Sequence, residues 1–200
     1  MRILTSQGEL DALYDQPLEP ALAKETDHLT SAYRALVEAS PFVVVATKGR
    51  GGLDCSPRGD KGQVVFVEDD YTLLLPDRRG NNRLDTLHNI VSCPDIGLIF
   101  LLPGKQELLR VRGTAQVVVD DALAQTYSVD GKQPKCFIKI AIGRVYFQCG
   151  RAVLRSGLWS NASPVDGLPS AGQMLKQASE DFDAETYDAA LAERQKGTLY

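Results

Sequence analysis

The densest group of residues that could carry chemistry is the arginine-rich run PDRRGNNRLD, at residues 76–85. It places three arginines within six positions, between an apolar run that predicts a strand and a pattern that predicts a helix. The start of a helix offers free backbone amides, and an arginine guanidinium matches the oxygens of a phosphate. The run therefore predicts an anion-binding loop. The alternative is a solvated turn in which Asn81 or Asn82 only caps the helix, although a cap requires no arginines.

A second polar motif is the run DCSPRGD at residues 54–60. Pro57 has no amide hydrogen to donate, so it belongs on an edge strand or at a bulge, where backbone groups are free for a ligand. The alternative is a tight turn in which Arg58 pairs with Asp60. This motif alone does not distinguish the two.

The other candidates favour structural roles. Arg110 and Arg112 alternate with Val111, which predicts an exposed face of a strand. The two histidines, His28 and His88, fall in helical patterns and leave little room for a histidine-rich metal site. The four cysteines form no CxxC pair. We therefore expect no metal, and the sequence identifies no catalytic side chain.

The composition limits the class of protein. The 200 residues are 44% hydrophobic and 24% charged, with a net charge of −4, as in an ordinary soluble globular protein. The acidic balance argues against nucleic acid as a partner. The most apolar stretch, residues 96–103, is too short to span a bilayer, and the first residues lack the layout of a signal peptide. We therefore expect a reduced, cytoplasmic protein without a membrane partner.

The hydrophobic pattern changes period along the chain. Apolar residues recur at helical spacing up to Pro41, and after Trp159 the chain becomes polar and helical again, with Ser170 and Asp183 as expected helix caps. Between these parts, β-branched or alternating runs predict about seven strands, at residues 42–47, 53–58, 63–67, 71–75, 96–102, 108–119 and 136–147.

Helices between the strands are expected only from about Asn82 to Ser92 and from Asp120 or Asp121. This pattern favours a small antiparallel barrel over a doubly wound sheet. We predict one domain over residues 1–200. Its parts are N-terminal helices (1–40), a barrel (41–155) and a C-terminal helical tail (156–200).

Three segments resemble the pyridoxamine 5′-phosphate oxidase-like, FMN-binding split-barrel family. They are Ser40-Pro41-Phe42, the SPRGD motif at 56–60 and the LPDRRGNNRLD run at 75–85, and they are most similar to a bacterial branch with SPRGD and PDRxGNNRxD motifs. The segment 151–159, which ends in RSGLW, is similar as well. The resemblance spans roughly residues 30–160. It implies a six-stranded antiparallel Greek-key split barrel that forms a homodimer, with FMN at the subunit interface.

The resemblance also implies which residues bind the cofactor. Arg58 and the backbone around Ser56 would lie along the flavin and its phosphate, and residues of the arginine-rich run would hold the phosphate. The full set of expected FMN-binding residues is Ser56, Pro57, Arg58, Pro76, Asp77, Arg78, Asn81, Asn82 and Arg83.

The chain departs from the family pattern where substrate binds. Authentic pyridoxamine phosphate oxidases end in a segment with an Arg-x-His motif, whereas this chain has no histidine after His88. We therefore do not expect vitamin B6 oxidation. Haem-degrading members use a histidine near the iron, and this C-terminal half has none. Relatives that use a deazaflavin remain an alternative.

The predicted function is an FMN-dependent oxidoreductase that transfers a hydride to or from an unknown small molecule. One alternative is a flavin-storage or flavin-sensing protein without turnover. Another is a structural dimer whose arginine-rich turn makes salt bridges between subunits. We expect the C-terminal helices and the apolar end Leu199-Tyr200 to dock on the flavin or on the partner subunit.

Overall fold

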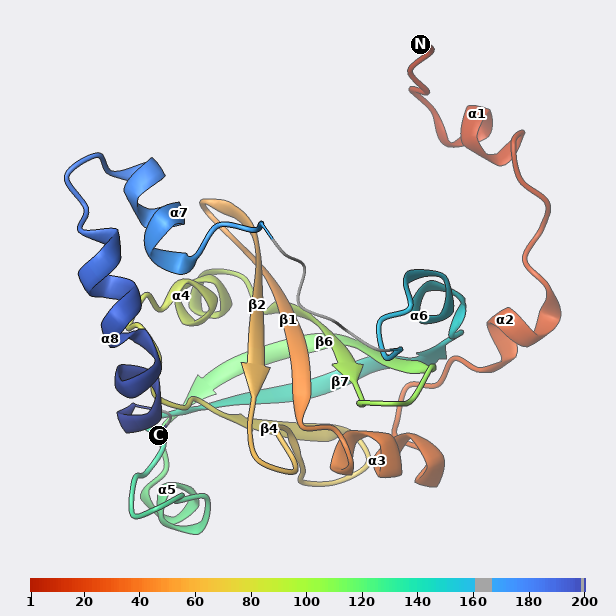
Figure 1. Cartoon of the computed structure of the whole chain (residues 1–200). Coiled ribbons are helices and arrows are strands. Elements are labelled where there is room, and N and C mark those ends of the chain that lie inside the picture. Colours follow the sequence, from red (N-terminus) through yellow and green to blue (C-terminus); the bar gives the residue numbers. More distant parts are fainter. Residues whose placement is uncertain (161–166, 199) are drawn as a thin grey trace.

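The computed structural model describes residues 1–160, 167–198 and 200, and its centre is one antiparallel sheet (Figure 1). The strands are β1 (Phe42–Gly49), β2 (Gly52–Gly59), β3 (Phe66–Val67), β4 (Thr72–Pro76), β5 (Asp95–Leu101), β6 (Leu108–Val118) and β7 (Phe137–Gln148). Their order across the sheet is β2-β1-β5-β6-β7-β4-β3. The predicted mainly β split barrel with helical additions is confirmed.

The sheet has seven strands, where the family resemblance implied six. The shortest strand, β3, has two residues and pairs with Leu73 and Leu74 of β4. The acidic turn after β3 folds the chain back, and its Glu68 amide donates a hydrogen bond to the Thr72 carbonyl at 3.0 Å. This short return creates the seventh strand and one of the two edges of the sheet.

The other edge is β2, which forms a hairpin with β1. The turn between them ends at Gly52, whose φ of +107° is a conformation that side-chain-bearing residues rarely adopt. Pro57 lies in β2 opposite Val44. Its position on an edge strand agrees with the prediction from its missing amide hydrogen.

One hydrophobic core fills the inside of the curved sheet. Alternate residues of β1, such as Val43 and Val45, point into it and are fully buried. Further buried members come from the neighbouring strands: Leu73, Leu75, Leu98, Phe100, Leu109, Val111, Ile138, Ile140 and Val145. Helix α3 (Ser31–Glu38) contributes Tyr33 and Val37 to this core. The core therefore positions β4 and also β1, with which β2 pairs, and the site lies where β2 and β4 end.

The remaining helices lie around the barrel. They are α1 (Gln7–Asp11), α2 (Glu19–Ala23), α4 (Asp85–Ser92), α5 (Asp121–Thr126), α6 (Arg151–Ser156), α7 (Ala171–Ala178) and α8 (Ala184–Gly197). The side chains of Ser170 and Asp183 cap α7 and α8 as predicted. Figure 1 shows α1 and α2 extending away from the barrel and α8 running toward the C-terminus beside it. Across the described residues, none of the helices is long and apolar enough to cross a membrane.

Helix α4 begins three residues later than predicted. The pattern placed its start near Asn82, but the helix starts at Asp85. Asn82 and Leu84 have φ values of 59° and 52°, in the left-handed region, and this conformation keeps them out of the helix. Leu84 is the residue before the helix and makes no side-chain cap, so neither Asn81 nor Asn82 acts as the cap.

The two longest strands, β6 and β7, approach each other very closely at Gly113. Their register shifts between Arg112 and Gly113. A Cβ atom on Gly113 would lie 1.9 Å from the carbonyl oxygen of Ala141. A backbone this close leaves room for glycine alone.

Replacing Gly113→Ala should therefore lower the free energy of unfolding by at least about 2 kcal/mol, because the added methyl must push the β7 backbone away. Gly97→Ala in the adjacent strand β5 is the matched control, since its Cβ would meet only the Ala46 side chain, at 3.9 Å. Urea denaturation followed by circular dichroism measures both. Equal stability of the two variants would contradict the steric explanation.

Candidate functional site: a basic pocket in the split of the barrel

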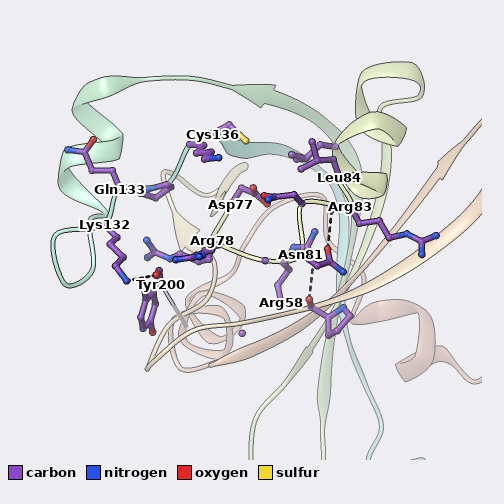
Figure 2. A pocket seen from close by; sticks show the side chains of 18 residues that line it. Arg58, Asp77, Arg78, Asn81, Arg83, Leu84, Lys132, Gln133, Cys136 and Tyr200 are labelled. Carbon is purple, nitrogen blue, oxygen red and sulfur yellow. Dashed lines mark hydrogen bonds between the residues drawn. The ribbon is translucent and has the colours of Figure 1, made fainter. Parts of the chain in front are cut away.

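A pocket of about 980 Å³ opens where β2 and β4 end, on opposite sides of the split in the barrel. Four parts of the chain line it: residues 57–59, residues 77–84 together with Leu87, residues 132–136, and Tyr200 (Figure 2). This volume lies at the upper end of the range for small-molecule pockets, about 300–1,000 Å³. We call it the basic pocket.

The lining of the basic pocket is strongly positive. Its charged side chains are six basic residues, Arg58, Arg78, Arg79, Arg83, Lys132 and Lys135, and one acidic residue, Asp77. The whole chain carries a net charge of −4. Positive charge concentrated in a concave surface of an acidic protein favours an anionic ligand.

Arg58 is held by polar side chains rather than by an ion pair. Its Nη1 donates to the Ser56 hydroxyl, and its Nη2 donates to Thr86 Oγ1 at 3.3 Å. Thr86 is 3% exposed and donates its own proton to the Asp54 carboxylate at 3.1 Å. Arg58 Nε is buried and, among the described residues, has no hydrogen-bond partner. A buried donor of this kind needs an acceptor, and an anion in the pocket would supply one.

Arg78 is clamped from several directions. Its Nε donates to Asp60 Oδ2 at 2.7 Å, and its Nη1 donates to the Tyr127 carbonyl at 2.6 Å. Both side chains of the ion pair are largely buried, with 15% of Arg78 and 6% of Asp60 exposed. Asp60 thus pairs with Arg78 of the other motif, and not with Arg58 as the turn alternative required.

The loop that precedes α4 supplies the exposed wall of the pocket. Asn81 accepts a hydrogen bond from the Arg83 amide at 3.0 Å, which folds the loop locally. Arg83 is 79% exposed and pairs with Asp85 at the start of α4. Figure 2 shows Arg83 on the opposite side of the pocket from Lys132. Arg83 is therefore anchored weakly enough to reorient toward a ligand.

Burial changes the acidity of two neighbouring groups in the pocket. It raises the pKa of the Asp77 carboxyl above its ordinary value, while the charges of Arg58 and Lys135 act in the opposite sense. Burial also raises the pKa of the Cys136 thiol to about 11, with a further contribution from Asp77. The Asp77 amide donates to the Cys136 carbonyl at 2.9 Å, so the backbone keeps the two residues together.

Seven of the nine residues predicted to bind the cofactor line this one pocket: Pro57, Arg58, Asp77, Arg78, Asn81, Asn82 and Arg83. The other two lie behind the wall. Ser56 contacts Arg58, and Pro76 is buried at the end of β4, opposite Phe137. Two motifs separated in the sequence thus meet in space, and their role in cofactor binding stays a prediction.

Sequence reasoning missed the contribution of Lys132 and Lys135, which lie in the loop between α5 and β7. Two lysines close to Pro134, just before an apolar strand, were the available signal. Tyr200 lines the pocket, whereas Leu199 lies outside the described residues. The expected docking of this end on the flavin or on the partner subunit stays a prediction. Within the described parts of the chain, no three His, Cys, Asp or Glu side chains gather in a way that could hold a metal ion.

The raised pKa of Asp77 predicts a pH-dependent cost to folding. At pH values above the folded pKa, the buried carboxylate opposes folding; below its unfolded pKa, about 3.9, the cost is absent. Asp77→Asn should therefore have a higher free energy of unfolding than the unmodified chain at pH 7. This difference should vanish as the pH falls through the pKa of Asp77 in the folded chain toward its unfolded pKa. Urea denaturation between neutral pH and pH 4 measures it.

The control for this prediction is Asp15→Asn, because Asp15 is exposed and lies outside the pocket. Its stability should follow that of the unmodified chain at every pH. An Asp77→Asn difference that does not change with pH would show that burial of the charge is not the cause.

Comparison with known proteins identifies relatives of this chain by sequence family and by fold. The family model of pyridoxamine 5′-phosphate oxidase matches residues 29–149. No curated protein matches the chain. Among solved structures, HupZ of Group A Streptococcus is 19% identical with a TM-score of 0.51, over 60% of this chain and 94% of that chain. At this identity the likeness establishes the fold alone.

Two further solved structures are similar. A candidate pyridoxamine 5′-phosphate oxidase of Lactobacillus delbrueckii is 23% identical with a TM-score of 0.49, over 60% of this chain and 95% of that chain. General Stress Protein 26 of Bacillus anthracis is 14% identical with a TM-score of 0.45, over 56% and 88%. The residues that the family model matches make up more than half of the chain and include both polar motifs. The chain therefore belongs to the pyridoxamine 5′-phosphate oxidase family.

Proposed function

We propose that this protein is an oxidoreductase that binds FMN in the basic pocket. It would use the bound FMN to transfer a hydride to or from a small molecule. Family membership supports a flavin cofactor in general, and the lining of the pocket supports one that carries a phosphate. The observation that carries the proposal is the buried, unpartnered Nε of Arg58 among six basic side chains. A phosphate oxygen is the acceptor that such a donor favours.

The residues of the pocket fit a phosphate group in charge and in donor type. Arg58 offers its buried Nε, and exposed Arg83 can turn inward from Asp85. Arg78 offers its remaining edge, because its Nε and Nη1 already bond protein acceptors. Asp77 would repel a phosphate, so we assign it to a hydrogen-bond donor elsewhere on the cofactor.

The chain's own contribution to the reaction is to bind the cofactor and to orient it. When bound, FMN supplies hydride transfer, which no protein side chain provides. The polar contacts of Arg58 with Ser56 and Thr86 set the direction of its guanidinium. The exposed mouth of the pocket, at the loop before α4, is where we propose that a small substrate enters.

A homodimer with FMN at the subunit interface completes the proposal. The pocket lies beside the edge strand β2, whose Leu53 is 84% exposed. Val91 on α4 is also exposed, at 79%. Apolar side chains left in solvent on β2 and α4, the two elements that also contribute to the pocket, favour burial by a second copy. Sedimentation of the FMN complex should give the mass of two chains; a monomer that holds FMN tightly would contradict the interface.

Arg58→Ala should weaken FMN binding by about ten- to a hundredfold, because a charge-assisted hydrogen bond contributes about 1.5–3 kcal/mol. Arg58→Lys keeps the charge but loses the planar fork of donors. Its affinity for FMN should therefore lie between those of Arg58→Ala and the unmodified chain. Quenching of flavin fluorescence on titration measures the Kd.

Arg50→Ala is the matched control, because Arg50 lies in the exposed turn between β1 and β2, outside the pocket. It should bind FMN like the unmodified chain. If all four proteins bind FMN equally, or none binds it, the cofactor proposal is wrong. Reduction of the bound FMN by NADH or NADPH in stopped flow separates an oxidoreductase from a storage or sensing protein.

A further inference from the structure

The C-terminal tail reaches into the basic pocket from outside the family domain. Helices α7 and α8 and Tyr200 all lie beyond residues 29–149, yet Tyr200 is part of the pocket lining. Lys132 Nζ donates to the main-chain oxygen of Tyr200 at 2.7 Å, and Figure 2 shows this contact on one side of the pocket. The tail is thus tied to the loop between α5 and β7.

The Tyr200 side chain acts on the ion pair between Asp60 and Arg78. Its hydroxyl donates to Asp60 Oδ1 at 2.6 Å, while Arg78 Nε donates to Oδ2 of the same carboxylate at 2.7 Å. The guanidinium carbon of Arg78 lies 5.9 Å from the centre of the Tyr200 ring, within reach of a cation–π contact. One aromatic residue therefore holds both members of the pair.

These contacts leave one part of Arg78 available. Nε bonds Asp60 and Nη1 bonds the Tyr127 carbonyl, whereas Nη2 has no hydrogen-bond partner among the described residues. Arg78 lines the pocket with 15% of its side chain exposed. The clamp therefore presents one edge of the guanidinium and immobilises the rest.

Tyr200 forms a wall of the pocket and does not fill it. The volume of about 980 Å³ is what remains with Tyr200 in place, at the upper end of the range for ligand sites. An aromatic side chain that leaves this much space does not block a ligand.

We propose that Tyr200 is a positioning residue for anion binding: by bonding Asp60 and covering Arg78, it holds the guanidinium so that its remaining edge faces the ligand. The inference rests on the proposed anion site, which it extends to a segment beyond the family domain. A preorganised donor loses less conformational entropy on binding, so the tail raises the affinity for the anion.

The first test uses no flavin. Phenylglyoxal modifies accessible arginines, and peptide mass spectrometry follows the reaction at Arg78, with pyrophosphate as a protecting anion. Tyr200→Ala should speed the modification of Arg78 and weaken protection by pyrophosphate about tenfold, as expected for one lost hydrogen bond to a charged group. Tyr200→Phe keeps the ring but loses the hydroxyl. Its rate of Arg78 modification and its protection by pyrophosphate should lie between those of Tyr200→Ala and the unmodified chain.

The matched controls are Tyr187→Ala and Tyr187→Phe. Tyr187 lies in the same tail, where its ring packs against Phe182 and Arg194, and it is not part of the pocket lining. Both controls should leave Arg78 reactivity and pyrophosphate protection unchanged. Equal effects at the two tyrosines would mean that the tail stabilises the fold in general, and would overturn the positioning role.

A double-mutant cycle tests the route through Arg78. In an Arg78→Ala background, Tyr200→Phe should leave the Kd for FMN unchanged, because the residue on which it acts is gone. The same loss of affinity in both backgrounds would overturn the inference. If pyrophosphate protection follows Tyr200 as expected but FMN does not bind, the cofactor proposal fails and the positioning role stands.

Discussion

The ion pair between Asp60 and Arg78 links the two sides of the split barrel. Asp60 follows β2, at one edge of the sheet, and Arg78 follows β4, next to the other edge. No strand pairing joins these edges among the described residues. Removing two charges from water is costly, and the cost is offset here because Tyr127 and Tyr200 add hydrogen bonds to the pair. This closure brings the two polar motifs, residues 54–60 and 76–85, to one pocket.

Arg58 and Arg78 differ in how fully the protein satisfies their hydrogen-bond donors. Arg78 is bound by a carboxylate, a carbonyl and an aromatic ring, so the protein alone determines its position. Arg58 is oriented through Thr86 and Asp54, yet its Nε stays buried without a partner. A buried unsatisfied donor costs about 1–3 kcal/mol. A fold that retains such a donor beside a cavity recovers that energy when a ligand brings an acceptor.

The sequence predicted the parts of this structure that depend on local patterns. The strands were predictable because runs such as residues 42–47 are rich in β-branched residues and end at turn residues. The caps of α7 and α8 were predictable because Ser170 and Asp183 act within one helical turn. The start of α4 was missed because the left-handed conformations of Asn82 and Leu84 leave no trace in the hydrophobic pattern.

Long-range pairings were harder to predict. Asp60 and Arg78 belong to different motifs, and only the closure of the barrel makes them partners. Lys132 enters the pocket through the loop between α5 and β7, far along the chain from either motif. The resemblance supplied the expected cofactor-binding residues within the family domain, but it carried no information about Tyr200, which lies beyond that domain.

The high pKa of Cys136 lowers the reactivity of its thiol toward oxidants. Oxidation of a cysteine proceeds through its thiolate, and a thiol with a pKa of about 11 is almost entirely protonated at neutral pH. Cys149, by contrast, is exposed, and the Arg151 amide lowers the pKa of its thiol. An oxidant that reaches both thiols should therefore oxidise Cys149 faster than the sulfur that forms part of the pocket wall.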